Sequence, residues 1–138
     1  MKQTEIIANG LGMSYRFGTY KEVNYLFDRG QSFPVVAELL PLKGSFELKY
    51  ASVKDVQDIT LLFLDVDGKA VDSEKTGKVI EHMKAKALEF ITALNQTGEF
   101  EPIDETTVQY FTVLKQFDKC LSGIEITLNL KPCKATCL

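Results

Sequence analysis

The clearest pattern along the chain is an apolar stripe at helical spacing near its middle. The residues of the stripe are Val79, Ile80, Met83, Ala87, Phe90, Ile91 and Leu94. Their spacing places them on one face of an α-helix. Asp72 or Ser73 can cap the first amide groups, and residues 95–98 supply a C-terminal stop. The sequence therefore predicts a long helix that begins near Ser73 or Glu74.

Before this helix, apolar residues alternate with polar ones, as they do in strands with one buried face. The alternation predicts four strands, over residues 23–27, 33–39, 46–50 and 59–64. Residues 28–32 and 41–44 are rich in Gly, Pro, Asp and Ser, so we expect turns there. We expect a polar connection over residues 52–58. Both faces of the fourth strand are apolar, which favours a central position in the sheet.

The two ends of the chain complete the predicted element order. Apolar residues at near-helical spacing within residues 1–17 predict a short helix, followed by a turn around Gly18. Residues 108–114 and 124–130 are β-branched, aromatic or strictly alternating, and predict two more strands. The order is αββββ-αββ. It favours the α+β class, with a mostly antiparallel sheet and two helices over one of its faces.

Amino-acid composition excludes several classes of protein but does not identify the function. A length of 138 residues favours a single domain over 1–138, with a polar C-terminal tail at 131–138. With 45% hydrophobic and 25% charged residues, the chain does not resemble disordered, collagenous or disulfide-dense proteins. The net charge of −3 shows no overall excess of basic residues, which a protein that mainly binds nucleic acid usually has. We find no signal peptide and no membrane-spanning run, so we expect a cytoplasmic protein without membrane contact.

The side chains that usually bind metals or cofactors are few. Cys120, Cys133 and Cys137 form an odd set, which is typical of reduced thiols. A metal site at Cys133 and Cys137 would need a second pair of Cys or His ligands, as in zinc-binding domains. The chain lacks a pair with the spacing found in those domains. The single histidine, His82, lies beside the apolar stripe of the long helix, which favours a solvated position. We therefore expect no metal and no cofactor.

One short motif suggests catalysis. Asp65 and Asp67 follow an apolar strand, and Gly68 turns the chain directly after them. The motif resembles the first motif of haloacid-dehalogenase-type phosphatases, which implies Asp65 as nucleophile and Asp67 as acid/base. That family has Thr after the Gly, where this chain has Lys69, and too few residues follow for a doubly wound domain. We favour a strand end, a turn and a helix cap, and keep a phosphatase-like hydrolase as the alternative.

A second resemblance covers most of the chain. Its carriers are Glu22–Asn24, Phe33–Val36, Ile59–Asp65, Phe90–Asn95 and Leu121–Leu128. In their order and amino-acid sequence these segments resemble small neck or tail proteins of tailed bacteriophages. These proteins form the tail-terminator and tail-completion family, and the resemblance is to the type found in prophages of Bacteroidetes. The resemblance implies a non-enzymatic virion structural protein that is made in the host cytoplasm and resides in the virion neck or tail.

The resemblance also implies an assembly. Members of that family form a hexameric ring, which joins the tail tube to the head–tail connector while DNA passes through the lumen without specific binding. They often reach over the neighbouring subunit with a β-hairpin. In this chain that hairpin would lie around Lys43 and Gly44, with Phe46, Leu48 and Tyr50 as contacts. The mild net acidity suits a wall to which DNA does not adhere.

The alternating strand at residues 46–50 gives this interface some independent physical support. An apolar face and a strand edge outside the central sheet both need a cover, and a second subunit is one way to supply it. The other interpretation is that the strand packs on a helix of its own chain. A third class of function is a small ligand-binding domain with a pocket under the long helix.

Overall fold

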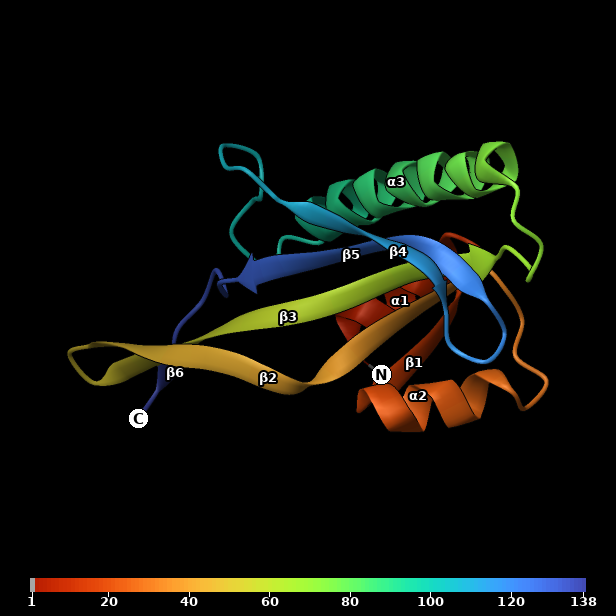
Figure 1. Cartoon of the computed structure of the whole chain (residues 1–138). Helices are drawn as coiled ribbons and strands as arrows, with labels where there is room; N and C mark the ends of the chain where they lie inside the picture. Colours follow the sequence, from red (N-terminus) through yellow and green to blue (C-terminus); the bar gives the residue numbers. More distant parts are fainter. Residues whose placement is uncertain (1) are drawn as a thin grey trace.

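Long β-strands dominate the computed structural model, which describes residues 2–138 (Figure 1). Within these residues the elements are α1 (Gln3–Gly10), β1 (Ser14–Gly18), α2 (Tyr20–Phe27), β2 (Val35–Lys49), β3 (Ser52–Val66), α3 (Ser73–Gln96), β4 (Tyr110–Gln116), β5 (Leu121–Leu130) and β6 (Thr136–Cys137). The strands form one six-stranded sheet in the order β1-β2-β3-β5-β4, and β6 pairs with β3. Among the described strands, only β1 and β2 pair in parallel. The predicted α+β class with a mostly antiparallel sheet is confirmed.

The centre of the sheet is β3, which was predicted from its two apolar faces. Leu61 and Phe63 point into the core on one face, beside the buried side chains of α1 and α3. Leu62 and Leu64 belong to a second core on the opposite face. Because neighbouring residues of a strand point to opposite faces, a strand buried on both sides needs this continuous apolar run.

The long helix α3 is confirmed, and so is its buried stripe. Met83, Ala87, Phe90 and Leu94 are its buried residues. The carboxylate of Asp72 caps the helix by accepting a hydrogen bond from the backbone N–H of Lys75 at 3.1 Å. The ring of Phe90 meets Phe63 of β3 edge to face at 5.5 Å, so the helix packs directly on the central strand.

The strand predicted over residues 23–27 was wrong, because this segment forms helix α2. Thr19 and Glu22 form a capping box, in which each side chain bonds the backbone N–H of the other. Val23 and Phe27 lie four residues apart and are both buried in the second core. Tyr25, which alternation would place with them, is exposed.

The N-terminal helix ends earlier than predicted. It stops at Gly10, and Gly12 turns the chain with a φ of +76°, a conformation that glycine adopts without strain. Residues 14–18 then form β1 beside β2. The described chain therefore has three helices instead of two. They cover both faces of the sheet instead of one, because α2 packs on the face opposite α1 and α3.

The turn predicted at residues 41–44 was wrong as well, since β2 runs through it. The ladder to β3 is irregular between Leu39 and Lys43, and Pro41 lies in this gap. A bulge tolerates proline because no ladder hydrogen bond is required there. The chain reverses at Tyr50 and Ala51 instead, and the predicted connection over residues 52–58 is the first half of β3.

Candidate functional site

The most distinctive surface feature is the distal half of the β2–β3 hairpin, which we call the arm. It comprises residues 43–57. The strand β1 pairs with β2 only as far as Leu39, and β5 pairs with β3 only from Gln57 onward. Beyond these points the two strands of the arm pair with each other, and near the tip β3 also pairs with the short β6. The arm therefore projects past the rest of the sheet (Figure 1).

One face of the arm is apolar and uncovered. Phe46 is paired with Asp55, and Leu48 with Val53, so these four side chains share a face. Phe46 is 73% exposed and Leu48 69% exposed. Within residues 2–138 no helix packs over them, so the interpretation in which this strand packs on a helix of its own chain does not describe the structure.

Tyr50 lies at the arm's tip and is 96% exposed. Its φ of +55° is in the left-handed region, which costs a side chain with a Cβ roughly 1–2 kcal/mol. Neither burial nor backbone preference explains an aromatic residue there. Such a residue suggests a role in recognition.

Lys43 lies at the base of the arm, away from the turn. It is exposed and pairs with Asp58 in the ladder. Its neighbour Gly44 faces the backbone of β3 so closely that a Cβ would lie 2.7 Å from the carbonyl oxygen of Val56. Glycine at this position thus permits close crossing of the two strands, where the sequence suggested a reversal of the chain.

A second apolar surface lies between α3 and β4. The sequence suggested a pocket under the long helix, but it did not identify the residues that line this one. This groove has a volume of about 150 Å³ and is lined by Lys84, Ala87, Leu88, Ile91, Val108, Tyr110, Ile124 and Ile126. Leu88 is 66% exposed although it lies on the long helix. An apolar residue beside the buried stripe was the one local signal for this groove. Its other walls come from elements distant in sequence.

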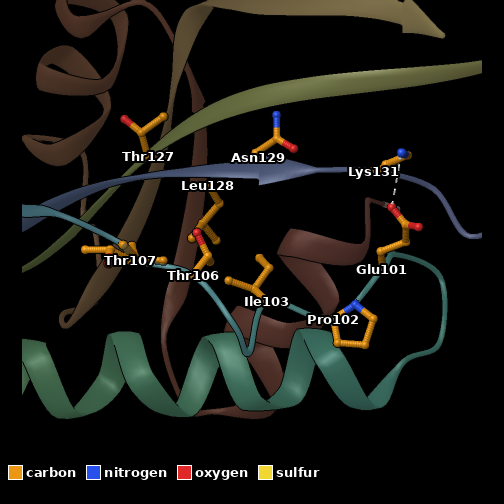
Figure 2. Close-up of a pocket in the computed structure, with 10 residues that line it drawn as sticks. Glu101, Pro102, Ile103, Thr106, Thr107, Thr127, Leu128, Asn129 and Lys131 are labelled. Carbon is orange, nitrogen blue, oxygen red and sulfur yellow. Dashed lines mark ion pairs between the residues drawn. The ribbon is translucent and has the colours of Figure 1, made fainter.

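A polar recess lies between residues 101–108 and the end of β5 (Figure 2). It encloses about 290 Å³ and is lined mainly by threonines, amide groups and aliphatic side chains. Lys131 at its rim forms ion pairs with Glu47 at 3.0 Å and Glu101 at 3.6 Å. The hydrogen bond that Lys131 donates to Glu47 is the main cause of a raised pKa for Lys131. The recess thus contains hydrogen-bonding groups, and its cation, Lys131, is already paired with two carboxylates.

The two carboxylates of the phosphatase-like motif have different surroundings. Asp65 accepts a hydrogen bond from the backbone N–H of Val66 at 2.8 Å. Asp67 is buried, and its Oδ2 accepts hydrogen bonds from Thr76 and Ser122, both at 2.7 Å. Lys115 lies 3.1 Å from the same oxygen. Asp67 therefore links the β3–α3 connection to α3, β4 and β5.

These contacts keep Asp67 charged. Burial raises the pKa of Asp67, but hydrogen bonds from Thr76, Ser122 and Lys115, with the charge of Lys115, outweigh it and bring the pKa below its ordinary value. Lys115 also donates to the carbonyl oxygens of Gly68 and Ala70 at 2.7 and 2.9 Å. The arrangement is that of a buried structural ion pair.

A second buried carboxylate, Glu38 of β2, ties α1 to the edge of the sheet. It accepts hydrogen bonds from Thr4 at 2.8 Å and Tyr15 at 2.7 Å, and Lys2 approaches it at 3.2 Å. Burial is the main cause of a strongly raised pKa at Tyr15. Every partner of this carboxylate comes from the N-terminal segment, so the cluster anchors that segment.

The remaining candidate residues lie at the surface. His82 is exposed on α3, as are the free thiols of Cys133 and Cys137 near the C-terminus, while Cys120 is partly buried. Among residues 2–138, no group of three or more His, Cys, Asp or Glu side chains is placed to hold a metal ion. None of the helices in the described residues is both long and apolar enough to cross a membrane.

The fold and the site define a class in general terms: a small α+β domain with one projecting apolar arm and one apolar groove. Comparison with protein-family models and with curated protein sequences gives no match to this chain.

Proposed function

We propose that this protein is a non-enzymatic assembly subunit that associates with copies of itself through the arm. The observation that carries the proposal is the uncovered apolar face of Phe46 and Leu48, together with Tyr50 at the tip. Exposed apolar patches on a small domain mark interaction surfaces, and aromatic residues are enriched where interfaces form. Hiding this face from water favours association.

The shape of the subunit supports a ring in particular. The arm projects beyond β1 and β5 and pairs only with the short β6 near its tip, so it can reach a different surface on another copy. Such head-to-tail contacts generate closed rings when the rotation between subunits closes. The resemblance to tail-terminator and tail-completion proteins makes this ring a hexamer at the neck or tail of a tailed phage.

In that setting the partners of the ring are the tail-tube and connector proteins. The ring would end the tube and join it to the head side, while DNA passes through the lumen without specific contact. The net charge of −3 supports such a passive lumen, because an acidic wall repels phosphates.

The first prediction concerns the oligomeric state. We expect the wild-type protein to form rings that electron microscopy resolves, and the double variant F46E/L48E to sediment as a monomer, because charges on the arm oppose desolvation. Analytical ultracentrifugation measures both. Val71→Glu is the matched control, since Val71 is also exposed and apolar but lies in the loop before α3. A wild-type protein that stays monomeric at every concentration would overturn the proposal.

The second prediction separates assembly from catalysis. With magnesium and a generic aryl phosphate, we expect no hydrolysis above background, because Asp67 is held in a buried ion pair with Lys115. A colorimetric assay with the wild type and Asp65→Asn tests this. Magnesium-dependent turnover that disappears in Asp65→Asn would favour the phosphatase-like alternative.

A further inference from the structure

Besides the outer edge of β1, two strand edges of the sheet lack a backbone partner within residues 2–138. One is the outer edge of β2 along the arm, because β1 ends its pairing at Leu39. The other is the outer edge of β4, the last strand in the sheet order. Open edges present unpaired N–H and C=O groups, which pair readily with another strand.

The edge of β4 adjoins the groove between α3 and β4. Its regular pairing with β5 covers Tyr110–Val113, and a register shift follows. Tyr110 pairs with Ile126 and Thr112 with Ile124, so Tyr110 and Thr112 face α3. A strand added beside β4 would place every second side chain next to Tyr110 and Leu88, over the groove.

From these two edges we infer that the arm of one copy adds as a strand to β4 of the next copy and places Phe46 and Leu48 in the groove between α3 and β4. This inference rests on the proposed self-assembly and names the receiving surface. The arm supplies apolar side chains two residues apart, and the groove supplies apolar walls beside a free edge. Strand addition of this kind combines backbone hydrogen bonds with side-chain pockets.

Charge supports the same occupant. The apolar face of the arm carries one acid, Asp55, opposite Phe46. The lining of the groove carries one cation, Lys84, whose Nζ lies 3.0 Å from a carboxylate oxygen of Glu81 on the same helix and 4.7 Å from the centre of the Tyr110 ring. Opposite charges at the rim of an apolar contact favour the correct register and the correct partner.

The arm cannot fill the groove of its own subunit. The strands β3 and β5 lie between β2 and β4 in the sheet, so the two free edges are on opposite sides of it. Contact between arm and groove therefore joins two copies. One copy keeps a free groove and the other a free arm, and further copies add to these until a ring closes.

A mixing experiment tests the inference. The arm variant F46E/L48E retains an intact groove, and the groove variant Leu88→Glu retains an intact arm. We expect each variant alone to weaken self-association by at least about 30-fold, as loss of a central interface residue does. Native mass spectrometry of the mixture should show a 1:1 heterodimer, because one intact contact remains. Ala85→Glu, an exposed position on the same helix, is the matched control, and circular dichroism verifies that each variant is folded.

The outcomes separate the two proposals. If Leu88→Glu assembles like the wild type while the arm variant does not, the arm mediates assembly but the groove is not its receptor, and this inference fails alone. If both variants are monomeric and their mixture shows no heterodimer, the arm contacts a different surface and the inference also fails. If the arm variant assembles like the wild type, both proposals fail.

Discussion

Replacing Gly123 by alanine is expected to remove most of the stability of the folded state. Gly123 lies in β5, where it pairs with Leu64 of β3 on one side and Val113 of β4 on the other. A Cβ at this position would overlap the carbonyl oxygen of Phe63 and lie 2.9 Å from its carbonyl carbon. These atoms belong to the backbone of the central strand, so no side-chain rotation relieves the clash.

The size of the effect follows from where the clash occurs. Separating β3 from β5 disturbs both apolar cores, since each strand contributes to both. We expect a loss of more than about 4 kcal/mol in the free energy of unfolding, most of the stability of a small domain. Urea denaturation followed by circular dichroism measures the loss, and a low yield of folded protein is the expected practical sign.

Gly77 provides the matched control. It lies inside α3, and a Cβ there meets no atom within 4 Å. Alanine is favoured over glycine in a helix interior, so Gly77→Ala should raise the free energy of unfolding by about 0.5–1 kcal/mol. If Gly123→Ala proves as stable as the wild type, the close approach of β3 and β5 is wrong.

The elements with strong, long patterns were predictable from the sequence. The stripe of α3 runs from Val79 to Leu94, about four turns of helix, and β3 has an apolar run that only a doubly covered strand needs. The segment 23–27 was too short for its alternation to be decisive. The capping box of Thr19 and Glu22 was the better signal for a helix, since it lies three residues apart at a helix start.

The candidate site was predictable only in part, for a similar reason. Phe46, Leu48 and Tyr50 were found because alternation is local, and all three are exposed on the arm. The position of the turn was missed because Pro41 marks a bulge as readily as a turn. The groove depends on α3, β4 and β5 meeting in space, which no local pattern encodes.

Substituting Asp67 by asparagine is expected to cost about 2–3 kcal/mol at pH 7. The change keeps the size of the side chain but removes the charge opposite Lys115, which lies 3.1 Å away. Removing one partner of a buried ion pair leaves the other desolvated without compensation, and a typical cost is about 3–5 kcal/mol. Because the Lys115 side chain is 26% exposed, water compensates part of the loss and we expect the lower figure. Urea denaturation at pH 7 measures the difference.

The pH dependence of that difference tests its cause. The pKa of Asp67 is lowered in the folded protein, so its charge stabilises the fold above the unfolded pKa of about 3.9. This contribution disappears as the pH falls through the lower folded pKa, and the gap between the wild type and Asp67→Asn should shrink there. Asp65→Asn is the matched control, because within residues 2–138 the Asp65 side chain bonds only the adjacent amide of Val66. We expect it to change the free energy of unfolding by less than about 0.5 kcal/mol. A gap that stays constant down to acid pH would mean that packing, and not the ion pair with Lys115, gives Asp67 its importance.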